Sequence, residues 1–575
     1  MDFNATPTRK EFPIFFLFLV ITLSFYYPTI GSGFTTDVTG GIERLSTRPF
    51  KDILISFGFP ALNQLSIALF YIQYQLFGTN GLGWYFVYGA LHSLNAFLLY
   101  LLFKELFARF NSVEGRRSFH LMVDGKRRTT KQGVKSGKWI ALAGAFLFLI
   151  SPYQSEVLVW KACQNYLLSV CFIFSSLLNL IWYLSTDQKK YLWRIHAFFL
   201  LALFTFEYGM VLPFLIFLLL IFFFLLQDAT KDIFQQIRVL ILPQLVALGG
   251  YFILMKVLFG NWVGHYGAAV HFNFPIKIML ANALKYLAKY VFFVRFYAHP
   301  TKTVVFHFID TNVFLLIGLL LILSLGLVVW YSRKGKKSIA FLLLCSLLFF
   351  TSLLPILNLY FYHLQYLIND RHAYLASAFL YMGIAIVAFQ LPKYIGPICL
   401  IAYMCISAFF LVQLNGHWQV STKIYNGLME NFRWYDAPQI VLLNVPDNYK
   451  GIYLYRIIQK QEKTRSGFED ALEYISAKDF KGQMLEVTQY NMETATDGVN
   501  VTQLTNNTLK VSFNQWGNWF WRNGIGAGAG YENDYYKVRF KGQWYELELK
   551  EGLLDAIFIY QDGEEWKEFE ITSLK

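Results

Sequence analysis

Long apolar runs dominate the first 413 residues of this chain. A membrane-crossing helix needs roughly 20 apolar residues to span about 30 Å of hydrocarbon. The chain of 575 residues is also 56% hydrophobic and only 15% charged, which is too apolar for a soluble domain. The sequence therefore predicts an α-helical polytopic membrane protein with about eleven transmembrane helices. Their expected ranges are 12–30, 80–103, 139–151, 163–184, 195–206, 208–227, 239–258, 312–331, 338–356, 373–391 and 395–413.

Basic residues gather in a few of the loops between these runs. The loop 104–138 carries ten Lys or Arg against three acidic residues, and further basic clusters lie at 189–194 and 333–337. Cytoplasmic loops of membrane proteins are enriched in Lys and Arg. These clusters share one side of the membrane only if the apolar stretch 196–227 is divided near Glu207. We therefore expect two short spans in that stretch.

The remaining loops then face the opposite side of the membrane. They include the segments 31–79 and 259–311, the turn at Glu156, the position of Arg371 and the C-terminal tail. We expect a multi-pass protein of a bacterial inner membrane, with its site and its tail on the periplasmic side. A lumenal face in another kind of cell stays open.

The chain changes character near Gln413. Residues 1–413 carry 33 basic and 15 acidic side chains, a net charge of +18, whereas residues 414–575 carry 17 and 22, a net charge of −5. The basic excess fits membrane topology and phosphate binding better than nucleic acid, which we do not expect as a partner. The tail holds short aromatic and β-branched segments at 451–458, 508–513, 535–540, 544–549 and 556–560. We expect a transmembrane domain over 1–413 and an extramembrane α+β, mostly β, domain over 414–575.

Four charged residues lie at the outer ends of the apolar runs: Asp37, Glu156, Glu207 and Arg371. Ionisable groups at membrane depth are costly, so their presence indicates a functional site. In the loop 259–311, His265 is a candidate substrate contact, with a structural role as the alternative.

An amphipathic helix is expected over about 274–297, lying on the membrane surface. Its cations Lys285, Lys289 and Arg295 would then face lipid phosphates. Either they anchor the helix at the headgroups, or one of them binds the phosphate of a substrate.

Several short motifs follow one another in a characteristic order. They are Phe34-Thr35-Thr36-Asp37, then 90–97, 151–157, 205–207 and 370–377. This succession resembles the GT-C superfamily of integral-membrane glycosyltransferases, in particular the TPR-containing transmembrane O-mannosyltransferases and their protein O-mannosyltransferase-like bacterial relatives. The resemblance implies a GT-C-like membrane domain that moves a sugar from a polyprenyl-phosphate-linked donor to a hydroxyl of a protein, a glycan or a lipid. The tail lacks the tandem helical repeats of about 34 residues that define TPR proteins.

The resemblance assigns roles to the charged residues. Asp37 would be the general base that takes the proton of the acceptor hydroxyl in a one-step, inverting displacement, or else a helix N-cap. Arg371 would bind the departing lipid phosphate, or else pair with Asp370 or Glu207. Glu156 and Glu207 would orient hydroxyls, hold a divalent cation together with Asp37, or pair with a cation.

Two other classes of function are compatible with the same pattern. A transporter or flippase of lipid-linked glycans also has many spans and charged groups, although its charges usually lie at the midplane. A non-catalytic envelope assembly protein would use the tail to bind a partner. We favour the transferase, with membrane lipid, a polyprenyl-linked sugar and an acceptor as partners; no metal ligands are assigned.

Overall fold

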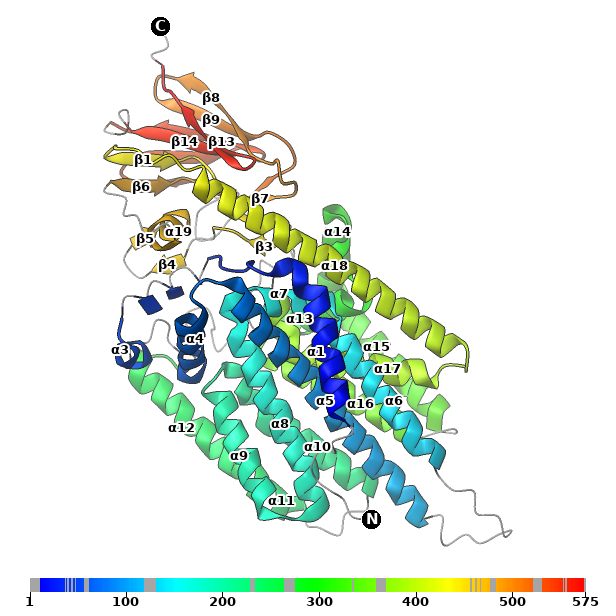
Figure 1. The fold of residues 1–575 in the computed structure, drawn as a ribbon. Helices are drawn as coiled ribbons and strands as arrows, with labels where there is room; N and C mark the ends of the chain where they lie inside the picture. The colour runs from blue at the N-terminus through cyan, green and yellow to red at the C-terminus, as the bar shows by residue number, and fades with distance from the viewer. Residues whose placement is uncertain are drawn as a thin grey trace.

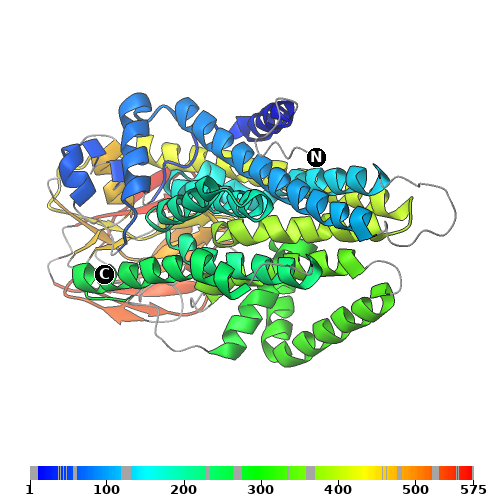
Figure 2. The ribbon, with the colours of Figure 1, turned by 90° about the horizontal axis from the view of Figure 1, so that it is seen from below.

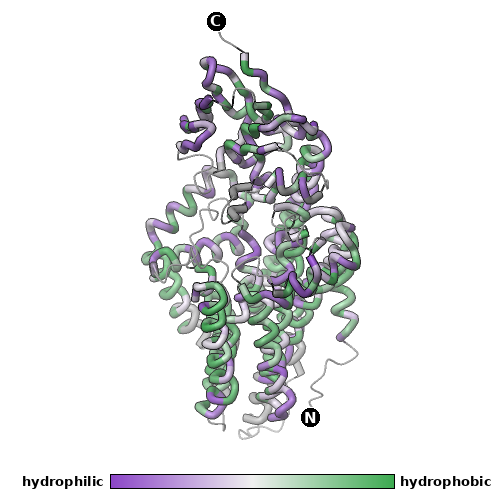
Figure 3. Tube along the Cα trace, turned by 90° about the vertical axis from the view of Figure 1, so that its left-hand side faces the viewer, coloured by the Kyte–Doolittle hydropathy of each residue, from purple (hydrophilic) through white to green (hydrophobic). Residues whose placement is uncertain are grey.

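A computed structural model describes most of the chain. The described residues are 11–36, 38, 41–42, 45–46, 48–55, 61–117, 131–227, 233–262, 275–332, 336–357, 369–455, 458–460, 463–465, 467–475, 482–520, 530–551, 553 and 556–572. They form a bundle of long apolar helices with a strand-rich region at one end, near the C-terminus (Figure 1). The bundle is mostly hydrophobic and the strand-rich end is mixed in character (Figure 3).

Each of the expected spans coincides with a helix. In chain order these helices are α1 (Phe12–Tyr26), α5 (Gly81–Arg117), α6 (Lys131–Leu149), α8 (Gln164–Thr186), α9 (Lys189–Leu203), α10 (Leu212–Gln227), α12 (Leu242–Phe259), α15 (Val313–Ser332), α16 (Lys336–Leu357), α17 (Tyr374–Gln390) and α18 (Ile395–Glu430). Seen from below, α1 in dark blue and α15 in green lie at opposite margins of the bundle (Figure 2).

Within the described residues, eight helices are long and apolar enough to cross a membrane. Two bent pairs raise the number to ten if each pair is one span: Gly137–Leu149 with Pro152–Val159, and Pro300–Thr311 with Val313–Gly326. Ten of the eleven expected spans meet this criterion, alone or as part of a bent pair. The exception is α9, whose 15 residues extend only about 22 Å at 1.5 Å per residue.

The break expected near Glu207 is present. Helix α9 ends at Leu203, the 3₁₀ turn η5 (Glu207–Val211) follows, and α10 starts at Leu212. The turn fits tightly against the end of α9, because a Cβ on Gly209 would lie 2.5 Å from the backbone nitrogen of Leu203. The tight turn reverses the chain, so α9 and α10 run in opposite directions.

Short elements cover the end of the bundle that faces the strand-rich region (Figure 1). They are η1 (Tyr27–Thr29), α3 (Phe50–Ile55), α4 (Gln64–Phe77), η3 (Pro152–Gln154), α7 (Ser155–Val159), η4 (Lys161–Cys163), α13 (Ile276–Phe292), η6 (Val294–Phe296), α14 (His299–Thr311) and η8 (Asp370–Ala373). At the opposite end, α11 (Ile233–Leu240) connects α10 to α12. The amphipathic helix expected over 274–297 corresponds to α13.

The C-terminal region is rich in strands. They are β1 (Gln439–Leu442), β2 (Val445–Tyr449), β3 (Ile452–Tyr453), β4 (Ile458–Lys460), β5 (Lys463–Arg465), β6 (Gln483–Glu486), β7 (Gln489–Met492), β8 (Val499–Thr505), β9 (Thr508–Phe513), β10 (Asn518–Phe520), β11 (Tyr531–Glu532), β12 (Tyr536–Phe540), β13 (Trp544–Leu549), β14 (Ile557–Asp562) and β15 (Glu565–Phe569), with one helix, α19 (Gly467–Ile475). The sheets have the orders β15-β14-β1-β6, β10-β7-β2-β3 and β11-β12-β13-β9-β8, with β4-β5 as a separate pair. Four of the five expected strand segments match β9, β12, β13 and β14.

Helix α18 joins the two regions without interruption. It begins at Ile395 in the bundle and ends at Glu430 beside the strands. The boundary expected between 413 and 414 therefore falls inside a helix. The sequence suggests a boundary there because α18 becomes polar where it leaves the bundle, although its backbone continues.

The described parts of the expected cytoplasmic loops, which include 104–117, 131–138 and 189–194, lie at the end of the bundle away from the strands (Figure 1). There Arg109 of α5 donates hydrogen bonds to the carbonyl oxygens of Ile181 and Leu184, at 3.2 and 2.9 Å. A cation at the C-terminal end of α8 satisfies carbonyl groups that the helix leaves without partners. The basic residues thus help to close this end of the bundle.

Reporter fusions test this orientation. We expect alkaline phosphatase to be active when it follows Lys575 and inactive when it replaces everything after Asp187, because the C-terminal strands and the C-terminal end of α8 lie at opposite ends of the bundle. Green fluorescent protein should give the reverse pattern. Activity of the same reporter at both positions would contradict the arrangement.

Candidate functional site

Arg371 and Glu156 form a buried ion pair. The backbone nitrogen of Arg371 donates a hydrogen bond to Glu156 Oε2 at 2.8 Å, and its Nη1 donates to Glu156 Oε1. Both residues are at most 9% exposed. A carboxylate that accepts both a backbone and a guanidinium hydrogen bond is held in a fixed position. Of the roles left open for Glu156, the structure shows pairing with Arg371.

The local fold explains how the two residues meet. Glu156 lies on the single turn α7, which is bent by 55° from the preceding helix. Arg371 lies on η8, directly before α17. Helix α17 packs against α6 so closely that a Cβ on Gly144 would lie 2.7 Å from Met382. The close packing of α6 and α17 brings the turns at their outer ends together.

A second buried ion cluster surrounds the neighbouring residue, Asp370. Its carboxylate is fully buried and forms ion pairs with Lys289 of α13 and Arg295 of η6. Phe293, between the two elements, has a φ of 54°, which ends α13 and turns the chain so that Arg295 also reaches Asp370. The two cations are at most 7% exposed.

The placement of these cations differs from the sequence expectation. Lys289 and Arg295 point to a buried carboxylate, whereas the sequence suggests that they face lipid phosphates. Lys285 pairs with Asp310 of α14, with Nζ 2.8 Å from Oδ2. Helical periodicity identifies the polar side of α13, but it does not reveal that acidic residues elsewhere in the chain cover that side.

Burial makes the charge on Lys289 dependent on its partner. Loss of water lowers the pKa of this ammonium group, and the nearby guanidinium of Arg295 lowers it further. An isolated charge in a dry interior is strongly unfavourable. The carboxylate of Asp370 is the direct ion-pair partner of this ammonium group.

Tyrosines surround the two ion clusters. Tyr290 donates to the carbonyl oxygen of Asp370 at 3.3 Å, and Tyr208 donates to that of Arg371 at 3.2 Å. Tyr153 donates to the carbonyl oxygen of Lys289 at 2.6 Å. Their rings are fully or almost fully buried. These hydrogen bonds fix the backbone of the residues that carry the charged side chains.

A cavity of about 230 Å³ opens beside Arg371. Its walls come from the first outer loop (the described residues between η1 and α4) and from α4, η4, α8, η5, α12 and η8. Its lining includes Trp160, Asn165, Tyr166, Glu207, Tyr251 and Arg371. Polar groups set among aromatic rings are typical of binding sites for small polar ligands.

Trp160 connects this cavity to the first outer loop. Its ring lies 4.9 Å from the guanidinium carbon of Arg371, and its indole nitrogen donates to the carbonyl oxygen of Thr35 at 3.2 Å. Val38 and Gly41 also line the cavity. Asp37 and His265 lie outside the described residues, so the structure places the described neighbours of Asp37, and not Asp37 itself, at the cavity.

Two of the described carboxylates have cationic partners. Glu156 and Asp370 are each paired with basic side chains. Within the part of the chain that the structure describes, no three His, Cys, Asp or Glu side chains are grouped as a metal site would require.

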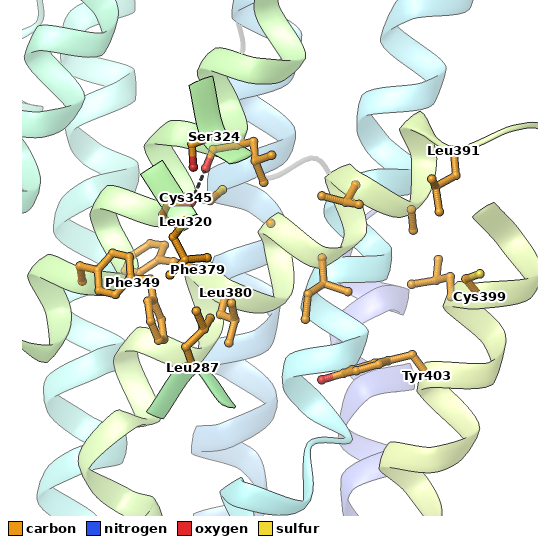
Figure 4. Close-up of a pocket in the computed structure, with 18 residues that line it drawn as sticks. Leu287, Leu320, Ser324, Cys345, Phe349, Phe379, Leu380, Leu391, Cys399 and Tyr403 are labelled. Atoms are coloured by element: carbon orange, nitrogen blue, oxygen red, sulfur yellow. Dashed lines mark hydrogen bonds between the residues drawn. The ribbon is translucent and has the colours of Figure 1, made fainter. Parts of the chain in front are cut away.

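A larger apolar groove of about 440 Å³ lies between α13, α15, α16, α17 and α18 (Figure 4). Leu287, Phe349, Phe379, Cys399 and Tyr403 are among its lining residues. Tyr403 donates to the carbonyl oxygen of Tyr290 at 2.7 Å. The groove thus reaches the tyrosine layer that surrounds Asp370.

Comparison with known proteins adds no assignment. No protein-family model and no curated protein sequence matches this chain. The resemblance to the GT-C superfamily therefore rests on the motifs of the sequence. Sequence reasoning also missed Trp160 and Asn165, because an aromatic or amide residue at the end of a span carries little signal of its own.

Gly33 fixes the first outer loop against α7. A Cβ at this position would lie 1.9 Å from the carbonyl oxygen of Val159, and φ is +86°. We expect Gly33→Ala to lower the free energy of unfolding by about 3 kcal/mol through steric overlap and backbone strain. Gly31→Ala is the matched control, with the same φ and no atom within 4 Å of the added Cβ. Thermal unfolding in detergent measures both; equal losses would show that the contact with Val159 is unimportant.

Asp370→Asn should destabilise the bundle more than a surface substitution does. The change leaves Lys289 and Arg295 buried without their carboxylate, which costs about 3–5 kcal/mol. Asp310→Asn removes the half-exposed partner of Lys285 and should cost less than about 1 kcal/mol. The measurement is again thermal unfolding, and similar stability of the two variants would argue against the buried cluster.

Proposed function

We propose that this chain is an integral-membrane glycosyltransferase of the GT-C type. It would transfer a sugar from a polyprenyl-phosphate-linked donor to a hydroxyl acceptor on the non-cytoplasmic face. The observation that carries the proposal is the cavity that joins Arg371 and Glu207 at the end of the bundle nearest the strands. This cavity is also lined by residues that follow Asp37 in the first outer loop.

The cavity has the chemistry of a sugar site. Sugars present hydroxyl groups at their edges and apolar C–H groups on their faces. Glu207 and Asn165 can exchange hydrogen bonds with hydroxyls, and the rings of Tyr166 and Tyr251 offer apolar surface. A cavity of this kind favours a small polar molecule over a metal ion or an extended peptide.

The charges beside the cavity suit an anionic leaving group. The ion pairs contain two carboxylates and three basic side chains, so they carry one formal excess positive charge. These groups are Glu156, Asp370, Lys289, Arg295 and Arg371. Arg371 lines the cavity and belongs to this set. A prearranged guanidinium stabilises the charge that grows on a departing phosphate. The pairing with Glu156 would keep Arg371 in position before the donor arrives.

The apolar groove supplies a place for the lipid part of the donor. It is lined almost entirely by hydrocarbon and aromatic side chains (Figure 4). Tyr403 of the groove donates a hydrogen bond to the carbonyl oxygen of Tyr290, the residue that follows Lys289 of the ion cluster in α13. An isoprenoid chain in the groove would therefore have its phosphate on the side of the basic groups.

The proposed reaction is a single displacement at the anomeric carbon. The acceptor oxygen forms a bond to this carbon while the bond to the phosphate oxygen breaks, and the leaving lipid phosphate keeps the electron pair. Asp37 takes the acceptor proton as a general base. Arg371 stabilises the leaving phosphate, and Glu207 orients hydroxyls of the sugar or the acceptor.

Substitution of the acidic residues tests the proposal. We expect Asp37→Asn and Glu207→Gln each to lower sugar transfer about a hundredfold or more, with little change in thermal stability. Glu105→Gln, a partly buried carboxylate on α5 away from the cavity, is the matched control. Mass spectrometry of envelope glycolipids and glycoproteins from cells with each variant, and from a deletion strain, gives the measurement.

The outcomes separate the competing functions. If the deletion strain lacks one sugar modification and accumulates its polyprenyl-linked donor, and both acidic variants behave like the deletion, the protein is the transferase. If the deletion strain changes but both acidic variants restore it fully, the transferase proposal fails. Trapping of the donor in the cytoplasmic leaflet would instead identify a flippase.

A further inference from the structure

One strand of the C-terminal region belongs to the core of the helical bundle. Ile452 and Tyr453 of β3 are at most 2% exposed and pack with the buried residues of the bundle, not with the core of the strand-rich region. Strand β3 pairs with β2, which in turn pairs with β7. The β2–β3 hairpin therefore extends from the C-terminal sheet to the helical bundle.

Tyr453 ends beside the candidate site. Its hydroxyl donates to Asn369 Oδ1 at 2.9 Å and accepts from Arg371 Nη1 at 3.4 Å. Its ring lies 5.0 Å from the ring of Trp160 and 5.9 Å from the guanidinium carbon of Arg371. The guanidinium group of Arg371 thus lies beside two aromatic rings that contact each other, one from each region of the protein.

A row of three hydrogen-bonded amide side chains supports the β2–β3 hairpin, and Asn448 and Asn491 of this row are buried. Asn448 donates to Asn491 Oδ1, and Asn491 donates to Asn518 Oδ1 at 2.7 Å. Asn448 also accepts a hydrogen bond from the backbone nitrogen of Gly451 at 2.9 Å, inside the turn. Lys450 and Gly451 have positive φ values of 47° and 80°, so the turn is tight and defined. A braced turn fixes the position of Tyr453, two residues later.

We propose that Tyr453 is a positioning residue through which the C-terminal region sets the orientation of Arg371 for an anionic, phosphate-bearing lipid. The inference rests on the proposed function, in which Arg371 binds the phosphate of the donor. Nη1 of Arg371 lies within hydrogen-bond distance of Glu156, Asn369 and Tyr453. The Tyr453 hydroxyl also donates a hydrogen bond to Asn369 Oδ1. Tyr453 therefore contacts Nη1 directly and also restrains Asn369, a second partner of this nitrogen.

The test measures the binding of polyprenyl monophosphate to the purified full-length chain in detergent, by titration in native mass spectrometry. We expect Tyr453→Phe, which keeps the ring and removes the hydroxyl, to weaken binding roughly tenfold. Tyr453→Leu, which also removes the ring contacts with Trp160 and Arg371, should weaken it further. Neutral polyprenol lacks the phosphate, so its affinity should be the same for all variants.

Tyr455→Phe is the matched control. Tyr455 is also fully buried, lies two residues away, and donates its hydroxyl to the carbonyl oxygen of Tyr425. It makes a comparable hydrogen bond within the C-terminal region, away from Arg371. Thermal unfolding of each variant identifies any general loss of structure, which would weaken the binding of polyprenol as well as that of its phosphate.

Each outcome has a definite meaning. A selective loss of phosphate-dependent affinity in Tyr453→Phe, absent from Tyr455→Phe, supports the inference. If the unaltered chain binds polyprenyl phosphate more tightly than polyprenol and Tyr453→Phe binds it equally well, the inference is wrong and the proposed function stands. If the unaltered chain does not distinguish the two lipids, the lipid-phosphate function fails, and the role of Tyr453 fails with it.

Discussion

The pair of adjacent residues Asp370 and Arg371 organises the end of the helical bundle that faces the strand-rich region. Their side chains have opposite charges and meet opposite partners: Asp370 contacts two cations from α13 and η6, whereas Arg371 contacts Glu156 of α7. Segments far apart in the chain are thereby held to one short turn before α17. Since buried charges are stable only when paired, this turn constrains every segment that supplies a partner.

Much of the bundle follows from simple patterns in the sequence. The apolar runs coincide with helices, and the distribution of basic residues among the loops correctly predicts a break near Glu207. The pairing of Glu156 with Arg371 was one of several open alternatives, because sequence separation of 215 residues says nothing about contact. Lys289 and Arg295 show the limit of periodicity, since a polar helix face can meet lipid headgroups or a buried acid with the same pattern.

The contribution of the C-terminal region was hidden for a different reason. Tyr453 lies in a short aromatic segment that resembles many other strands of the tail, and its partners Trp160, Asn369 and Arg371 are all remote in sequence. The composition change near Gln413 predicts a transmembrane domain followed by an extramembrane domain, and it carries no information on contacts between them. In the structure, one helix crosses that point and one hairpin returns to the bundle.

Helix α18 has a mechanical consequence. Its 36 residues extend for about 54 Å at 1.5 Å per residue, and together with the β2–β3 hairpin they connect the strand-rich region to the bundle at more than one place. The strand-rich region can rotate relative to the bundle only if α18 bends and Tyr453 loses its contacts with Trp160 and Arg371. Because the strand-rich region is attached at more than one place, its distance from the cavity beside Arg371 is set when the chain folds.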